Sequence, residues 1–150
     1  MIFTKTNLPG SYLIDLEKNE DERGFFARYF CKSEFERQGL ESKWVQVNNS
    51  QSSIRGTLRG LHFQQSPHGE VKLIRCIKGA IWDVIVDIRM GSHTYGKWFS
   101  AELTAENRTM MYVPQGFAHG FISLVDNSEI LYMVSEAHNP KFERTLRWND

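Results

Sequence analysis

The sequence predicts an all-β fold, a β-sandwich or jelly roll with one or two short helices. Short stretches in which apolar and polar residues alternate recur about every ten residues. Gly, Pro, Asn and Asp separate these stretches, as they separate the strands of antiparallel folds. Only one segment carries a clear helix signal. Barrels and sandwiches of this class often bind a ligand at the barrel mouth.

The helix signal lies near the N-terminal third of the chain. Ser33 is followed three residues later by Glu36, the spacing of a capping box in which each side chain bonds the other's backbone N–H. We expect a short helix that begins at this box and continues to about Gln38. Gly39 should end it, since glycine readily adopts the left-handed conformation found after helices.

The expected strands occupy most of the remaining chain. Residues 80–89 give the clearest alternation, with Trp82 and Val84 on one parity and Asp83 and Asp87 on the other. Successive side chains of a strand point to opposite faces of its sheet, so the two sets should face different surroundings. The other expected strands are residues 44–48, 72–77, 98–103, 109–113, 117–124 and 129–135.

Length and charge limit the domain count and the partners. The chain has 150 residues, 18 basic and 18 acidic, so we expect a single domain over residues 1–150. Nucleic-acid and membrane-surface binders normally carry a basic excess, and the balanced charge predicts neither partner. An anionic ligand would therefore depend on a few Arg and Lys side chains in one pocket.

The termini and cysteines indicate a cytoplasmic location. The first residues lack the basic flank and apolar core of a signal peptide, and no apolar run approaches the roughly 18–20 residues of a membrane span. Cys31 and Cys76 have no second thiol at chelating distance. We expect both to be buried free thiols.

Cationic side chains lie within segments that otherwise read as core strands. Arg59 and His62 alternate with leucine and phenylalanine in residues 55–64, and Lys72 follows soon after. A lone histidine among apolar residues is usually a core histidine with one hydrogen-bond partner. Three cations close together would be too costly to desolvate without an anion or a water-filled pocket, which favours a binding site.

Two further polar residues have both a structural and a functional interpretation. His119 follows the tight turn at Gly116. It is either a buried histidine bonded to a carbonyl or one held in a single tautomer by Asp83 of a neighbouring strand. Tyr132, taken alone, reads as a core aromatic.

The histidine pattern argues against a metal centre. The five histidines are scattered, and no His-x-His pair is present. His62 and His119 could still converge with a carboxylate, so a metal-dependent oxygenase stays open as an alternative. We expect neither a metal nor a redox cofactor.

Seven ordered blocks resemble the dTDP-4-dehydrorhamnose 3,5-epimerase family, a cupin-type jelly-roll group of sugar-nucleotide enzymes. Their order and separations match the family over nearly the whole chain from about Asp21. The resemblance implies a cupin-like β-sandwich and cofactor-independent isomerase activity. It also implies a nucleotide-sugar substrate and a homodimer in which N-terminal residues complete the partner's site. The blocks are residues 21–26, 45–50, 56–64, 72–76, 83–89, 113–121 and 147–150.

The resemblance assigns three catalytic roles. His62 is implied to remove the proton beside the C4 ketone, Lys72 to stabilise the enolate oxygen, and Tyr132 to return a proton on the opposite face. Imidazole, with an ordinary pKa of about 6.5, is a competent base near neutral pH, and a phenol keeps its proton there. The implied ligand contacts are Arg23, Gln46, Asn48, Arg59, His119, Glu143 and His138, with Arg23 and Arg59 facing the diphosphate.

Three departures from the family pattern leave parts of the function open. Position 28 is Arg28, where many members carry an acid near the nucleotide. Position 138 is His138, where a tyrosine that stacks on the base is common. The carboxylate that pairs with the catalytic histidine usually lies beyond position 150. The nucleotide, the choice of C3 or C5 and the carboxylate that orients His62 therefore stay undetermined.

Two other functions would use the same residues. A keto-sugar isomerase would enolise the same ketone but return the proton to a different atom. A non-catalytic sugar-nucleotide binding module would need the ligand contacts without turnover. Tyr132 as a second proton carrier favours the epimerase.

Overall fold

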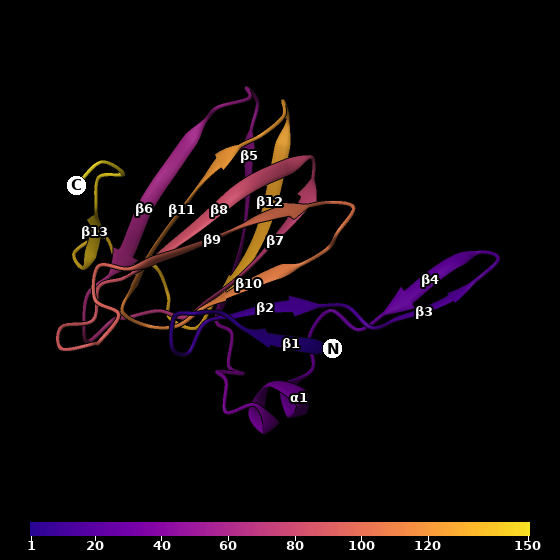
Figure 1. The fold of residues 1–150 in the computed structure, drawn as a ribbon, viewed down its shortest axis with the longest axis horizontal. Coiled ribbons are helices and arrows are strands. Elements are labelled where there is room, and N and C mark those ends of the chain that lie inside the picture. Colours follow the sequence, from indigo (N-terminus) through magenta and orange to yellow (C-terminus); the bar gives the residue numbers. More distant parts are fainter.

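The computed structural model describes residues 1–150 as two facing antiparallel sheets, one helix and a projecting hairpin (Figure 1). The six-stranded sheet runs in the order β1 (Ile2–Lys5), β2 (Tyr12–Asp15), β10 (Met110–Val113), β7 (Lys72–Lys78), β12 (Ser128–Val134) and β5 (Gln46–Ser52). The five-stranded sheet runs β13 (Glu143–Thr145), β6 (Leu58–Gln64), β11 (Phe117–Ser123), β8 (Ala80–Asp87) and β9 (Trp98–Thr104). The predicted all-β sandwich is confirmed.

The buried side chains form two hydrophobic clusters, because successive residues of a strand point to opposite faces of its sheet. Residues at alternate positions of both sheets, such as Ile74 and Ile85, meet in the space between them. The opposite face of the six-stranded sheet carries Leu73 and Met110, which pack against Phe35 of the helix. One sheet therefore has an apolar layer on each side, and the helix covers the outer one.

The helix begins earlier than the sequence indicates. Helix α1 spans Lys32–Arg37 with Cys31 as N-cap, and no side chain caps its N-terminus. The expected capping box at Ser33 is therefore wrong, because Ser33 lies inside the first turn and its hydroxyl contacts the Cys31 thiol instead. The predicted stop is confirmed, with Gly39 at φ +70°. No helix of the protein has the length and apolarity needed to cross a membrane.

The expected central strands are present, and most of their ends move by one or two residues. The segment expected at 44–48 begins at Gln46 and extends to Ser52. Strands β1, β2 and β13 were not expected, nor was the hairpin of β3 (Lys18–Asp21) and β4 (Gly24–Ala27). Strand β3 is fully exposed and polar, so it has no apolar face that alternation could reveal.

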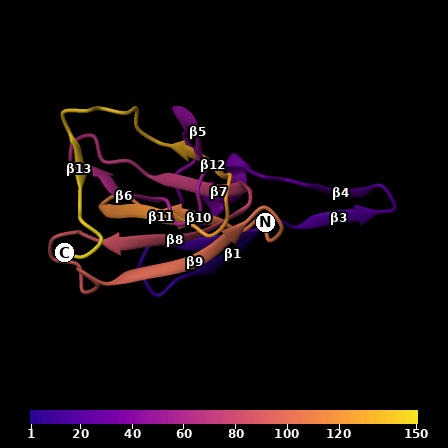
Figure 2. The ribbon, with the colours of Figure 1, turned by 90° about the horizontal axis from the view of Figure 1, so that it is seen from above.

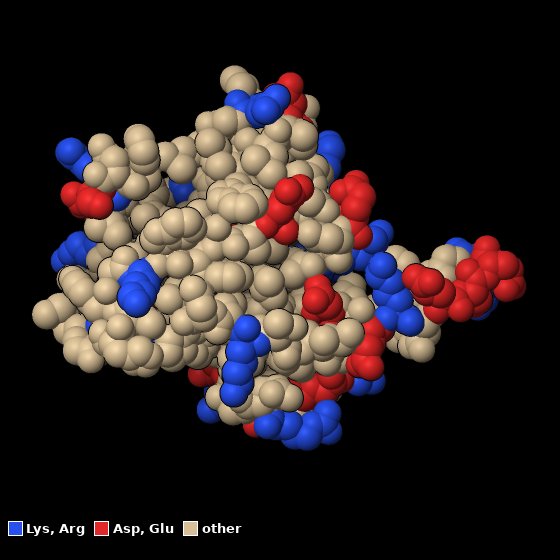
Figure 3. Space-filling model, in the orientation of Figure 1, with Lys and Arg blue, Asp and Glu red and all other residues tan.

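Hairpin β3–β4 projects from the body in both ribbon views (Figures 1 and 2). Phe26 is 75% exposed there, while the Phe25 ring lies under the Arg108 guanidinium at 4.7 Å. Acidic side chains gather at the tip of the arm (Figure 3). Its length and lack of core packing make it available to another surface.

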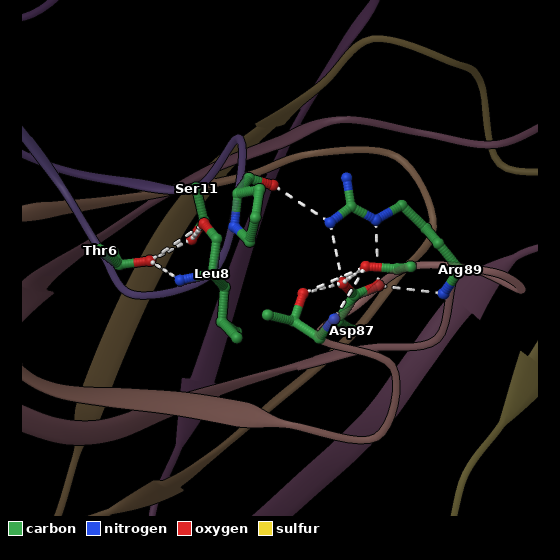
Figure 4. A network of polar contacts seen from close by, with 8 residues as sticks. Thr6, Leu8, Ser11, Asp87 and Arg89 are labelled. Carbon is green, nitrogen blue, oxygen red and sulfur yellow. Dashed lines mark hydrogen bonds and ion pairs between the residues drawn. The ribbon is translucent and has the colours of Figure 1, made fainter.

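A buried carboxylate fastens the loop after β8 to the N-terminal segment (Figure 4). Asp87 is fully buried and accepts hydrogen bonds from Arg89, Ser92 and Thr94. Arg89 Nη2 also donates to the carbonyl of Pro9 at 3.1 Å. Burial alone would raise the pKa of Asp87, but these hydrogen bonds outweigh it and hold the pKa well below its ordinary value.

Candidate functional site

Two adjoining cavities occupy one end of the space between the sheets, with volumes of about 500 and 300 Å³. His62, Lys72 and Tyr132 line both of them. These are the three side chains expected to carry the chemistry, and the fold brings them together. The first cavity is also lined by Ser50, Leu58, Arg59, Gly60, His119, Gly120, Phe121 and Ile130, and the second by Gln46, Asn48, Phe63, Gln64, Glu70, Val134, His138 and Glu143.

The three central side chains come from opposite sheets. His62 lies on β6 of the five-stranded sheet, whereas Lys72 on β7 and Tyr132 on β12 belong to the six-stranded sheet. Lys72 Nζ lies 3.5 Å from the His62 carbonyl oxygen. A planar sugar enolate bound between the sheets would therefore have the imidazole on one side and the phenol on the other.

A β-bulge brings both Arg59 and His62 to the cavity. Residues three apart in a regular strand point to opposite faces, but β6 shifts register against β11 between His119 and Phe121. The backbones approach closely here: a Cβ at Gly120 would lie 2.6 Å from the Arg59 carbonyl oxygen. Arg59 then reaches β5, where its Nε donates to Ser52 Oγ at 3.2 Å.

A buried carboxylate holds the second histidine. His119 Nε2 lies 2.7 Å from Oδ1 of Asp83 on the neighbouring strand β8. Asp83 is fully buried, and its Oδ2 has no partner. The contact fixes which imidazole nitrogen faces Asp83 and leaves the ring edge at the cavity wall.

Burial sets the protonation of the two candidate proton carriers. Desolvation lowers the pKa of His62, against the opposing influence of Glu143, so the ring is a free base at neutral pH. Desolvation raises the pKa of Tyr132, and the carboxylates of Glu70 and Glu143 add to the effect. The phenol therefore keeps its proton, which suits a proton donor.

The polar rim of the second cavity is an ordered network. Gln46 Nε2 donates to Asn48 Oδ1 at 2.8 Å, and His138 Nε2 lies 3.0 Å from Glu143 Oε2. The contact with His138 lowers the pKa of Glu143. These four residues, all expected to bind ligand, lie together at the rim.

Arg23 is the one predicted contact that lies elsewhere in this chain. It sits at the turn of hairpin β3–β4, 82% exposed, with Nη2 2.5 Å from Asp21 Oδ2. Arg28, the departure from the family pattern, pairs with Glu34 of helix α1 at 2.7 Å. Neither side chain lines the two cavities.

The sequence analysis missed Glu70. Its Oε1 lies 3.0 Å from Lys72 Nζ, and both side chains are nearly buried. Glu70 lies two residues before the strand expected at 72–77, and this i, i+2 spacing from Lys72 was the available signal, since such residues share a face of an extended chain. The Pro-His-Gly run before Glu70 is typical of a loop, so the sequence did not indicate that Glu70 lies in the site.

No three His, Cys, Asp or Glu side chains gather in an arrangement that could hold a metal ion. His62 and His119 are register partners across β6 and β11, but the nearest contact of His119 is the single carboxylate of Asp83.

Known proteins match the chain over its whole length. The family model described as dTDP-4-dehydrorhamnose 3,5-epimerase matches residues 5–150. The enzyme of that name from Methanothermobacter thermautotrophicus is 45% identical over 149 residues, which are 99% of this chain and 79% of the relative.

Solved structures agree with the sequence match. The crystal structure of the same enzyme from Elizabethkingia anophelis superposes with a TM-score of 0.96 at 42% identity, covering 100% of this chain and 82% of the other. That from Bacillus anthracis, solved with TDP and PPi bound, has a TM-score of 0.95 at 40% identity, covering 99% of this chain and 85% of the other.

Proposed function

Because the chain belongs to the dTDP-4-dehydrorhamnose 3,5-epimerase family, we infer that it epimerises C3, C5 or both in a nucleotide-linked 4-keto-6-deoxy sugar. One observation carries the residue assignment: His62, Lys72 and Tyr132 line the same cavities and come from opposite sheets. The reaction is an isomerisation, with no net oxidation or reduction.

The inversion proceeds in two proton transfers. His62 removes the proton from the carbon next to the C4 ketone, and the electron pair moves onto the ketone oxygen to form an enolate. The Lys72 ammonium stabilises that oxygen, where one such donor is typically worth about 10²–10³ in rate. Tyr132 then protonates the carbon from the opposite face and regenerates the ketone. Proton exchange with solvent restores both side chains.

The substrate carries a nucleoside diphosphate, for which dTDP is our proposal. The relative from Bacillus anthracis binds TDP, and Arg59 at the cavity wall offers a planar fork for phosphate oxygens. His119 and Glu143 would bind the sugar, and His138 would face the base. Gln46 and Asn48 complete the polar contacts at the rim.

The enzyme acts as a homodimer in this proposal. Arg23 lies on hairpin β3–β4, which projects from the body (Figure 1), and it lines neither cavity of its own chain, so a second copy is needed for it to reach a diphosphate. The outer face of the five-stranded sheet also exposes Trp82 and Trp98, which line an apolar groove of about 440 Å³ together with the exposed Trp148 of the C-terminal tail. Exposed apolar surface of this kind is typical of interfaces.

We further propose that the protein works in the cytoplasm. Cys31 and Cys76 are free thiols in the folded chain, Cys76 buried as expected and Cys31 only partly buried because it is the N-cap of helix α1. Reducing compartments preserve such thiols. Fractionation of cells that express the tagged full-length protein tests this location, and recovery outside the cytoplasm would refute it.

Solvent-isotope exchange tests the activity. The protein is incubated in D2O with dTDP-, CDP-, UDP- and GDP-linked 4-keto-6-deoxyglucose, and deuterium at C3 and C5 is read separately by NMR. We expect incorporation with the dTDP sugar at one or both carbons. The same spectra would reveal a moved carbonyl, the product of a keto-sugar isomerase. No incorporation with any of the four substrates would overturn the proposed function.

A further inference from the structure

Glu70 forms an ion pair with the proposed enolate-stabilising lysine. The Glu70 and Lys72 side chains are 12% and 10% exposed, and 3.0 Å separates Oε1 from Nζ. The ammonium donates one hydrogen bond within the chain, to the His62 carbonyl oxygen at 3.5 Å. The carboxylate is therefore the main fixed partner of Lys72 before a substrate arrives.

Hydrogen bonds to Ser135 hold the backbone at Val71, which lies between Glu70 and Lys72. Val71 N donates to Ser135 Oγ at 2.8 Å, and Ser135 N donates to the Val71 carbonyl at 3.0 Å. These bonds extend the pairing of β7 with β12 by one residue. Val71 turns to the outer core, so Glu70 and Lys72 share the face directed at the cavity.

The Lys72 ammonium shares the cavities with one permanent cation, the Arg59 guanidinium, and with histidine, tyrosine and carboxylate side chains. His62 and Arg59 on β6 and His119 on β11 face the same space, with Glu143 on β13 and the Tyr132 phenol on β12. Burying an ammonium beside the permanent charge of Arg59 is unfavourable unless an anion compensates. Glu70 is the carboxylate in direct contact with Lys72.

We propose that Glu70 is a positioning residue for the reaction: its carboxylate pairs with the Lys72 ammonium and keeps it directed at the ketone oxygen. This inference rests on the proposed function and names a residue that the function by itself does not require. Glu70 acts through Lys72 and exchanges no proton with the sugar. When the enolate forms, the ammonium shares its N–H donors between Glu70 and the new oxyanion.

The same carboxylate acts on the proton donor. Glu70 is one of two acids that reinforce the raised pKa of Tyr132, after burial itself. A phenolate near Glu70 would bring two negative charges together, which disfavours ionisation before the enolate needs its proton. One side chain thus supports both the stabilising cation and the acid.

The first test measures Lys72 without a substrate. Competitive labelling of the intact protein with acetic anhydride across pH, read by peptide mass spectrometry, reports the deprotonated amine. In Glu70→Gln the pH of half-maximal Lys72 labelling should fall by about one unit or more, since the opposing charge is lost. In Glu70→Asp, which keeps the charge, it should stay closer to wild type. A labelling curve for Glu70→Gln identical to that of wild type would overturn the proposal.

The second test measures turnover. Glu70→Gln should lower kcat for isotope exchange by about tenfold or more, leave KM within about twofold, and move the alkaline limb of the rate profile to lower pH. Glu136→Gln is the matched control, because it removes a carboxylate paired with His68 outside the cavities and should leave all three quantities unchanged. Wild-type kcat and profile in Glu70→Gln would refute the proposal.

The two assays separate this inference from the proposed function. The labelling experiment needs no substrate, so a wild-type protein without isotope exchange would refute the activity while the Lys72 result still stands. Thermal unfolding of each variant, followed by circular dichroism, identifies any loss of fold. If Glu70→Gln unfolds, Glu70→Asp decides: it should show normal labelling and a reduced kcat, because the shorter side chain holds Lys72 less well.

Discussion

At the scale of single residues, the proposed chemistry depends on two proton carriers with different charge states. His62 is a free base and Tyr132 a neutral acid at neutral pH, both because of desolvation. His62→Ala and Tyr132→Phe should each lower kcat by at least about 10². The dissociation constant for dTDP should change little, since neither group is assigned to the nucleotide. Isotope exchange and calorimetric titration measure the two quantities.

A matched variant controls for general effects on the cavity. Ser50→Ala removes a hydroxyl from the same wall without touching a proposed proton carrier, and its kcat should remain near that of wild type. If His62→Ala and Tyr132→Phe both turn over as fast as Ser50→Ala, the roles of base and acid are assigned to the wrong residues.

The sequence predicted single residues best where polarity interrupts an apolar strand. Arg59, His62 and Lys72 stood out for that reason, and all three line the site. Glu70 did not, because an acid beside a turn is unremarkable until its neighbour is known to be buried. The position of Arg23 on a free arm depends on a hairpin without core packing, which hydrophobic periodicity does not describe.

At the scale of elements, the β-bulge between β6 and β11 determines what faces the cavity. Gly120 has an ordinary φ, but a Cβ there would approach the Arg59 carbonyl oxygen at 2.6 Å. Gly120→Ala should therefore separate the strands locally, destabilise the protein by about 1–3 kcal/mol and reduce kcat. Urea unfolding and isotope exchange measure the effects.

Gly69→Ala provides the comparison for this element. A Cβ at Gly69 would meet Gln115 only at 3.6 Å and beyond, an ordinary contact. Both its stability and its activity should resemble those of wild type. An equal response in the two glycine variants would mean that close packing at the bulge has no special part in shaping the site.

The sequence predicted some strands well, but it misplaced the start of the helix and did not indicate the shortest strand. Central strands such as β8 were predicted nearly in full, because each of their two faces has its own environment, which selects the side chains on that face. The start of α1 was misjudged because Ser33 and Glu36 match a capping pattern by spacing alone, whereas the N-cap is Cys31. Strand β13 has only three residues, too few for alternation to be recognised.

At the scale of the whole molecule, the Asp87 network links acid pH to stability. The folded-state pKa of Asp87 lies below its unfolded value, so its contribution is complete above about pH 4 and declines as pH falls further. Asp87→Asn should lose roughly 3 kcal/mol at pH 7 and show a flatter decline of stability in acid. Chemical unfolding at several pH values measures both effects.

An exposed acid serves as the reference for that experiment. Glu102→Gln removes a carboxylate from the surface of β9, and its stability should follow that of wild type at every pH. Parallel acid profiles for Asp87→Asn and wild type would show that the Arg89 network does not couple protonation to folding.

The proposed dimer makes a prediction about mixed subunits. Arg23→Ala and His62→Ala should each be impaired alone. If Arg23 of the partner subunit completes each site, a hybrid dimer contains one intact site, and mixing the two proteins after unfolding and refolding should recover about a quarter of wild-type activity. Activity no higher than the average of the two variants would place Arg23 in its own subunit's site or outside catalysis.

The His62 imidazole belongs to one sheet and the Tyr132 phenol to the other. The distance between the two groups therefore depends on the thickness of the hydrophobic layer between the sheets. That layer is set by interior side chains such as Ile74, Ile85 and Leu103, which line neither cavity. A substitution that adds or removes a methyl group in the interior can therefore change which carbon of the sugar both groups reach. Every polar residue of the site would stay the same. Stereochemical outcome in this architecture is partly a property of packing.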